Sequence, residues 1–199
     1  EAKARKMCDD ASFFNKEAIY YPAKDAIFYS ADVHGNQITG ERLRCISRII
    51  NHSSTGEGVL TVVTTMDGIA DRLIPVERFK EAVITLDYSS EIEPEKLAKK
   101  LVAMGFVRTG MVEDKGQFAI RGGIIDIFSY TDEAPVRIEL WDTEVDSIRM
   151  FDVESQRSIE RLQSYSIFPA TEYIFTEDEL KNGLYNIKEE CDRQLECFD

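Results

Sequence analysis

Six carboxylates lie in or beside expected strands within residues 126–152: Asp126, Glu139, Asp142, Glu144, Asp146 and Asp152. Three that converge would hold Mg²⁺ for phosphodiester chemistry, because hard cations prefer oxygen ligands. Strand alternation argues against convergence, since Glu139 faces opposite to Ile138. Glu144 and Asp146 instead share a face with Ile148, and that face also carries apolar side chains. The sequence therefore predicts no metal site, and a carboxylate nuclease is only the third alternative.

Other catalytic patterns are not apparent in the sequence. The pattern Gly-x-x-x-x-Gly-Lys-Ser/Thr does not occur, so nothing in the chain cradles a triphosphate. His34 and His52 lie in loop-like surroundings and form no evident pair with a serine or cysteine nucleophile. The sequence therefore predicts neither an enzyme nor a cofactor. The cysteines form no Cys-x-x-Cys pair, which predicts reduced thiols: Cys8, Cys45, Cys191 and Cys197.

Arg121 is the best candidate for recognition, because it stands between an apolar run and two glycines. Phe118 and Ile120 point to the core of the expected strand, so the side chain of Arg121 projects from the other face. Two interpretations remain open. The guanidinium is either solvated or paired with a neighbouring acid, or it presents its donors to a carboxylate on a partner. Arg108 is the second candidate and Phe128 the third, although Phe128 fits a core position equally well.

Two further arginines, Arg137 and Arg149, lie in expected strands beside Glu139 and Asp146. Cross-strand ion pairs with these acids account for both arginines. We therefore assign them to the structure and not to recognition.

The composition is that of a folded, acidic protein. Of 199 residues, 43% are hydrophobic and 31% are charged, and the net charge is −13. No segment has the basic excess that phosphate binding favours, so we expect no direct binding to DNA and a protein partner instead. No apolar run approaches the ~20 residues of a membrane span, which predicts no membrane contact and a cytoplasmic location. The chain begins at Glu1 within a helical pattern, which favours a fragment of a larger protein.

Residues 1–75 alternate between helical and strand patterns, as half of an α/β domain does. The β-branched run over residues 59–64 predicts a strand buried on both faces of a parallel sheet. Thr39 is the expected cap of a helix that ends near His52, after a loop over residues 32–36. The other expected elements are a helix over 1–14, strands over 18–22 and 26–29, and a short helix over 69–73.

Residues 76–168 predict a small α+β domain, with one helix on a twisted antiparallel sheet. The glycines Gly122-Gly123 mark either a hairpin turn or a bulge in one long strand. Thr176 caps a last helix over residues 177–198, whose apolar face is expected to pack on the rest of the chain: Leu180, Leu184, Ile187 and Cys191. The elements expected in 76–168 are a helix over 93–104 and strands over 82–87, 106–112, 118–120, 124–128, 136–141, 145–151 and 164–168.

Three stretches of the sequence carry a resemblance: residues 116–128, residues 135–139 and residues 146–152. They resemble the signature of the module shared by bacterial transcription-repair coupling factor and the excinuclease protein UvrB. Residues 155–158 and 169–172 favour the coupling-factor branch. The resemblance covers nearly the whole chain and is far more specific than a short motif.

The resemblance implies three parts. Residues 1–75 would be an incomplete, degenerate helicase-like domain (1a), residues 76–168 a UvrA-binding-type domain (2), and residues 169–199 the start of a truncated domain (1b). The implied role is to recruit the excinuclease protein UvrA in transcription-coupled nucleotide excision repair, with an intramolecular contact to the C-terminal part of the parent protein. That absent part would carry an ATP-dependent translocase.

The same resemblance qualifies the site and leaves an alternative. In UvrB the matching strand reads Arg-x-Arg-Gly, whereas here Ala119 takes the first of those positions before Arg121. The alternative function is a nucleic-acid-handling module like UvrB. That protein needs an aromatic hairpin between strands of the first domain, and residues 60–75 leave no room for one.

Overall fold

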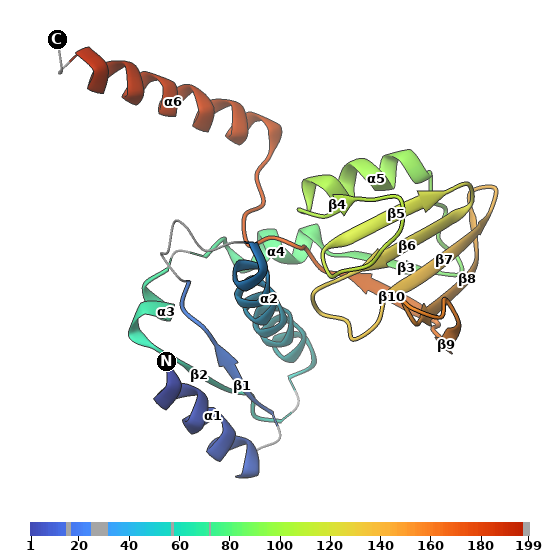
Figure 1. Ribbon diagram of the computed structural model, residues 1–199, viewed down its shortest axis with the longest axis horizontal. Helices are drawn as coiled ribbons and strands as arrows, with labels where there is room; N and C mark the ends of the chain where they lie inside the picture. The colour runs from blue at the N-terminus through green and yellow to red at the C-terminus, as the bar shows by residue number, and fades with distance from the viewer. Residues whose placement is uncertain (15–16, 25–31, 57, 72, 197–199) are drawn as a thin grey trace.

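Two parallel strands and a long helix form the N-terminal part of the chain in this computed structural model (Figure 1). The structure describes residues 1–14, 17–24, 32–56, 58–71 and 73–196. β1 (Ala18–Tyr21) pairs in parallel with β2 (Thr61–Thr64), and both contact α1 (Ala2–Phe14). The α/β character expected for this part is confirmed. The strand expected over residues 26–29 lies outside the described residues.

The long helix α2 (Asp32–Thr55) differs from the prediction at its start. It begins before Thr39, so the expected loop over residues 32–36 and the expected cap are wrong. A glycine and an asparagine in this stretch have low helix propensity, but the burial of one helix face overrides such a weak local preference. Leu43 and Ile50 provide that burial, because both lie in a hydrophobic cluster that also holds residues from outside the helix.

Two residues of α2, Gly40 and Arg42, join the N-terminal part to the rest of the chain. A Cβ at Gly40 would lie 2.9 Å from Cδ1 of Tyr130, so only glycine permits this close approach. Arg42 is fully buried and donates two hydrogen bonds to the carboxylate of Glu172, which lies 130 residues further along the chain. The sequence reasoning found neither contact.

The elements after β2 depart in detail from the expectations. α3 (Met66–Ala70) begins earlier than predicted because Thr65 caps it, its hydroxyl accepting from the amide of Gly68 at 3.2 Å. α4 (Val76–Ala82) is a helix that the sequence reasoning missed. Val62 is 39% exposed, so β2 is not buried on both faces. The physical reason is that β1 and β2 form a sheet of only two strands among the described residues.

The second part of the chain encloses the main hydrophobic core. A six-stranded sheet covers one side of this core, and α5 (Pro94–Ala103) and a two-stranded sheet of β3 (Ile84–Asp87) and β10 (Ser164–Ile167) cover the other. The six strands lie in the order β4 (Val107–Arg108), β5 (Gln117–Arg121), β6 (Ile124–Phe128), β7 (Val136–Trp141), β8 (Glu144–Phe151) and β9 (Ser158–Arg161).

The glycines after Arg121 form a hairpin turn and not a bulge. Arg121 pairs with Ile124 in the antiparallel register of β5 and β6, which leaves two residues in the turn. Gly122 has a φ of 60°, a backbone conformation that a side chain disfavours. A Cβ at Gly123 would lie 2.9 Å from the carbonyl oxygen of Leu140, so β7 also requires glycine here.

The sheet is mixed, which corrects the expectation of an antiparallel one. β4 pairs in parallel with β5, whereas the other neighbours are antiparallel. β4 comprises two residues instead of the seven expected, because the chain turns away over residues 109–116 to bring β5 back in the same direction. β9 was not predicted, and its four residues are all exposed at the sheet edge, so they lack the alternation that marks a half-buried strand.

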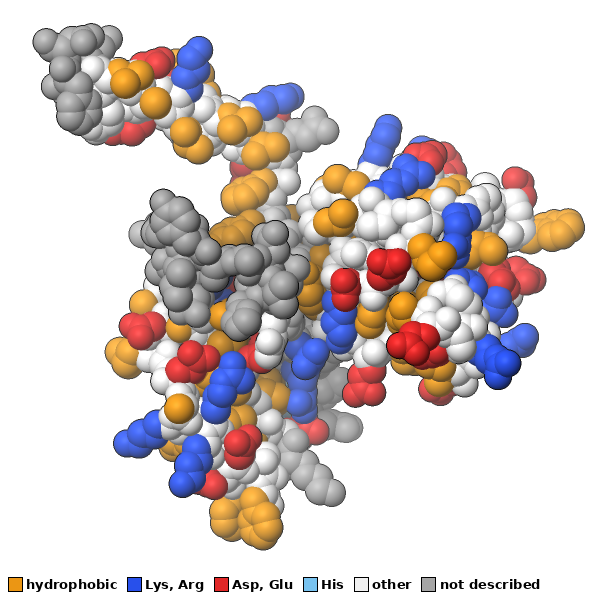
Figure 2. All heavy atoms as spheres, in the orientation of Figure 1, with side chains coloured by type: hydrophobic (Ala, Val, Ile, Leu, Met, Phe, Trp, Pro, Cys, Tyr) orange, Lys and Arg blue, Asp and Glu red, His pale blue; other side chains and the backbone are white. Residues whose placement is uncertain are grey.

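The last helix, α6 (Glu177–Glu196), begins with the expected cap at Thr176. The Thr176 hydroxyl accepts from the amide of Glu179 at 3.2 Å, and the Glu179 carboxylate accepts from the amide of Thr176 at 2.9 Å. The helix extends away from the rest of the chain, and Figure 2 shows hydrophobic side chains along it in contact with solvent. Leu180, Leu184 and Ile187 are exposed, so the expectation that they pack on the rest of the chain is wrong.

Asp132 is expected to give the stability a pH dependence of defined sign. Its partly buried carboxylate accepts a 2.6 Å hydrogen bond from the Tyr165 hydroxyl, and burial raises the pKa of Asp132 above its ordinary value of 3.8. Because the folded pKa exceeds the unfolded one, the stabilising contribution is complete only below the unfolded pKa and is lost as pH rises through the folded pKa.

Asp132→Asn keeps an acceptor for Tyr165 but cannot ionise. We therefore expect the free energy of unfolding of this variant to increase relative to that of the wild type as pH rises from about 4 to about 7. Urea unfolding at both pH values measures the difference. A difference that stays constant with pH would contradict the assignment.

Candidate protein-recognition face

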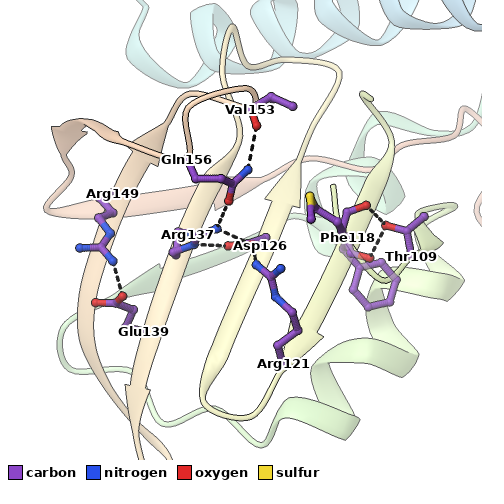
Figure 3. A network of polar contacts seen from close by, with 10 residues as sticks. Thr109, Phe118, Arg121, Asp126, Arg137, Glu139, Arg149, Val153 and Gln156 are labelled. Atoms are coloured by element: carbon purple, nitrogen blue, oxygen red, sulfur yellow. Dashed lines mark hydrogen bonds and ion pairs between the residues drawn. The ribbon is translucent and has the colours of Figure 1, made fainter. Parts of the chain in front are cut away.

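One face of the six-stranded sheet carries a network of polar side chains centred on Asp126 (Figure 3). Arg121 on β5 donates from Nη2 to Oδ2 of Asp126 at 2.6 Å. Arg137 on β7 donates from Nε to Oδ1 at 2.7 Å and from Nη2 to Oδ2 at 2.9 Å. The side chain of Asp126 is 2% exposed, so its negative charge is stabilised by these two arginines and not by bulk solvent.

Arg137 holds the part of this network that lies away from Arg121. Its Nη2 also donates to Oε1 of Gln156 at 2.8 Å, and Nε2 of Gln156 donates to the carbonyl of Val153 at 2.8 Å. The guanidinium of Arg137 lies 4.3 Å from the ring centroid of Phe151, and the hydrogen bonds to Asp126 raise its pKa. Arg137 is therefore held in place by several contacts and is mostly buried.

Arg149 and Glu139 form a second ion pair on the same face. The Ser147 hydroxyl donates a hydrogen bond to Oε2 of Glu139 at 2.7 Å. The expectation that Glu139 pairs with a strand arginine is confirmed. Asp146 does not pair with the other arginine, Arg137, because the register of β6 and β7 places Asp126 opposite Arg137. The sequence reasoning missed this role of Asp126, although counting back from the Gly122-Gly123 turn pairs it with Ala119 on the same face as Arg121.

Of the two arginines that bond to Asp126, Arg121 has the greater access to solvent. Its side chain is 41% exposed, against 12% for Arg137. One hydrogen bond to Asp126 holds it, and its remaining N–H donors have no partner in the described ranges. Of the two interpretations left open by the sequence, the structure shows pairing with a neighbouring acid, and this pairing leaves donors free.

Phe128 lies at the other end of the same face. Cross-strand pairing sets it opposite Gln117, and it packs with Val112 and Ala119 in a small hydrophobic cluster. The ring is 8% exposed, and Nζ of Lys115 lies 5.4 Å from its centroid. Phe128 is therefore mainly a packing residue in this structure, and only its margin is open to a partner.

Arg108 is placed elsewhere. It lies on the edge strand β4 opposite Phe118, whose side chain is in the main core, so Arg108 projects toward the α5 side of the sheet. There Nη2 and Nη1 donate to the two carboxylate oxygens of Glu95 on α5 at 3.1 Å and 3.3 Å, and these hydrogen bonds lower the pKa of Glu95. The structure therefore does not bring Arg108 to the face that carries Arg121.

The described residues contain no group of three histidine, cysteine or acidic side chains that could hold a metal ion. Both oxygens of Asp126 face arginines, which is the wrong environment for a cation ligand. Among the same residues, none of the helices is both long enough and apolar enough to cross a membrane.

Comparison with known proteins identifies the region that carries this face. Residues 84–173 match the family described as the UvrB interaction domain. The chain is 40% identical over 187 residues to the transcription-repair-coupling factor of Bacillus subtilis (strain 168), covering 93% of this chain and 16% of that protein. It is 36% identical over 195 residues to the Staphylococcus aureus (strain Mu50) protein of the same name, and 37% identical over 168 residues to that of Staphylococcus haemolyticus (strain JCSC1435). The chain spans about one sixth of the length of these relatives. It is therefore part of a protein of the transcription-repair-coupling factor family, and the face around Asp126 belongs to its UvrB interaction domain.

Proposed function

We propose that this stretch recruits the excinuclease protein UvrA in transcription-coupled nucleotide excision repair through the sheet face that carries Arg121. The observation that carries the proposal is the hydrogen bonding of Arg121. One hydrogen bond to the buried carboxylate of Asp126 orients its guanidinium, and its other donors are free in the described part of the chain. A guanidinium of this kind suits a carboxylate on a protein partner, because its planar set of donors matches two carboxylate oxygens.

The proposal extends to the other parts of the chain. Residues 1–75 serve as the incomplete helicase-like domain, residues 76–168 as the recognition domain and residues 169–199 as the start of the next domain. The net charge of −13 supports a protein partner over duplex DNA. Catalysis is assigned to the parent protein and not to this stretch, and a contact with the C-terminal part of the parent would regulate access to the face.

Arg121→Ala tests the proposal. Asp126 keeps both hydrogen bonds from Arg137 in this variant, so we expect the free energy of unfolding to fall by less than about 1 kcal/mol. If the guanidinium pairs with a buried carboxylate of the partner, we expect binding to weaken by about 2–5 kcal/mol. Titration calorimetry against UvrA, with thermal melts of each variant, measures both quantities.

Arg193→Ala is the matched control, because Arg193 is an exposed arginine on α6, away from the sheet. We propose smaller losses of affinity for Arg108→Ala and for Phe128→Leu, since Arg108 projects toward the α5 side of the sheet and Phe128 is mostly buried. Equal affinity of wild type and Arg121→Ala, with folding intact, would move the binding surface off this face.

A further inference from the structure

A groove of about 420 Å³ lies between β3 and α5, on the side of the six-stranded sheet that is covered by α5 and thus opposite to the face of Arg121. Its floor is apolar and comes from β3, from the segment that follows it and from α5: Ile84, Leu86, Ile92 and Leu97. Lys96 and Lys100, one helical turn apart on α5, form one wall. A volume of this size is within the range of ligand-binding clefts.

The edge of β3 beside this groove has free backbone groups. β3 pairs with β10 alone among the described strands. The amide of Asp87 donates to Oγ of Ser90 at 3.0 Å and its carbonyl accepts from the amide of Ser90 at 3.1 Å, so both point away from β10. Because backbone groups alternate in an antiparallel ladder, the amide and carbonyl of Thr85 also point away from β10. Alternation thus leaves both groups without a partner on β10, and none of the turn and loop hydrogen bonds of the described residues involves them.

The charges along the groove select the chemistry of an occupant. Lys96 is paired with Glu93 at 2.7 Å, near the end of the groove where α5 begins, and Glu91, three residues before α5, also lines the groove. Lys100 lies one turn further along the helix, and no acidic side chain in the described ranges is paired with it. An acidic side chain on a bound segment would complement Lys100 at this end.

We propose that this groove binds an extended acidic peptide segment of another protein, which adds a strand to the open edge of β3. The backbone of the segment pairs with the amide and carbonyl of Thr85. Alternate side chains of the segment enter the apolar floor, and an acidic side chain lies against Lys100. This site is separate from the Arg121 face and does not depend on the function proposed for that face.

The test uses a displayed library of random octapeptides selected against the 199-residue chain. The expected result is enrichment of peptides in which apolar residues alternate with acidic ones. Thr85→Pro removes the edge amide without disturbing the ladder, since that amide does not bond to β10 and proline is tolerated on an edge strand. We expect it to weaken binding of a selected peptide about tenfold, because the backbone hydrogen bond donated by the edge amide is lost.

Thr85→Val is the matched control. It loses the 3.1 Å contact of the Thr85 hydroxyl with Ser166 Oγ, as the proline variant does, but keeps the edge amide. We expect its affinity to stay within about twofold of wild type, as for an ordinary surface substitution. Lys100→Glu should weaken acidic peptides about tenfold, whereas Arg121→Ala should leave peptide binding unchanged. Thermal melts confirm that each variant folds.

Three outcomes would overturn the proposal. The first is a library that yields no enriched peptides. The second is equal peptide affinity of the Thr85→Pro and Thr85→Val variants, both folded. The third is a chain that dimerises in solution and becomes monomeric on Thr85→Pro substitution, because a second copy would then be the occupant of the edge.

Discussion

Arg42→Ala is expected to lower the free energy of unfolding by about 3–5 kcal/mol, because it removes the buried counter-charge of the Glu172 carboxylate and leaves the partly exposed Lys24, 3.1 Å away, as its remaining salt-bridge partner among the described residues. Arg42 is 0% exposed, and its Nε and Nη2 donate to Glu172 at 2.6 Å and 3.0 Å. Its Nη1 donates to the carbonyl of Pro22 at 2.7 Å and lies 3.1 Å from Asp71. The guanidinium also lies 4.3 Å from the ring centroid of Tyr21.

Urea unfolding of Arg42→Ala and of Arg48→Ala measures this effect against a matched control. Arg48 lies on the same helix, but its side chain is partly exposed and pairs with the exposed Glu17, so its loss should cost less than about 1 kcal/mol. Replacing both members of the buried pair, as Arg42→Met with Glu172→Met, should recover much of the stability, since an apolar pair carries no desolvation penalty. Equal losses of stability in the two alanine variants would show that the buried pair of Arg42 and Glu172 contributes no more than an exposed ion pair.

Asp126→Ala is expected to have an effect of similar size, about 3–5 kcal/mol, because it leaves two arginines beside one another without the carboxylate between them. Leaving Arg137 without the carboxylate costs more stability than leaving Arg121 without it, because the side chain of Arg137 is mostly buried. Asp146→Ala is the control, because Asp146 is an exposed aspartate on β8 of the same sheet. Chemical denaturation of both variants gives the comparison, and a loss below about 1 kcal/mol for Asp126→Ala would show that solvent replaces the carboxylate.

Asp126 also bears on the proposed recognition. If it acts by orienting Arg121, then Asp126→Asn should weaken binding of UvrA in the wild-type background and have no further effect on binding in the Arg121→Ala background. Additive losses of affinity would instead indicate that Asp126 contacts the partner or supports the fold as a whole.

The sheet of the second part was largely predictable because its signals are local. Glycines at 122 and 123 close one hairpin, and Asp142, with a φ of 58°, occupies the turn of another. The helix over 94–103 was predictable from proline and acidic residues in its first turn and from its single apolar stripe. In the second hairpin, β7 alternates apolar and polar residues with the period that a strand on a core requires.

The N-terminal part was less predictable, since its elements depend on contacts distant in sequence. Gly40 favours a helix break by propensity, and only the position of Tyr130 shows why a glycine lies within α2. The start of α2 and the helix α4 could not be read from local preference for the same reason. The apolar face of α6 was expected to be buried, but its pattern does not specify what covers it.

In the candidate site, too, local features were predictable from the sequence and contacts between strands were not. Alternation in β5 was enough to place Arg121 on the face away from the core. The pairing of Arg137 with Asp126, rather than with a nearer acid, required the register of β6 and β7. Arg108 could be assigned to a strand but not to a side of the sheet, because that depends on the pairing of β4 with β5, which sets it opposite Phe118.

The bond between Arg42 and Glu172 also has a consequence for synthesis on the ribosome. The N-terminal part emerges first with Asp71, which pairs with one nitrogen of Arg42, but 130 residues must follow Arg42 before Glu172 can accept its other two hydrogen bonds. Until then α2 cannot bury this charge at low cost, so the helix should remain exposed to chaperones and proteases while the later part folds on its own local contacts. The N-terminal part, although translated first, should thus be among the last to reach its final structure.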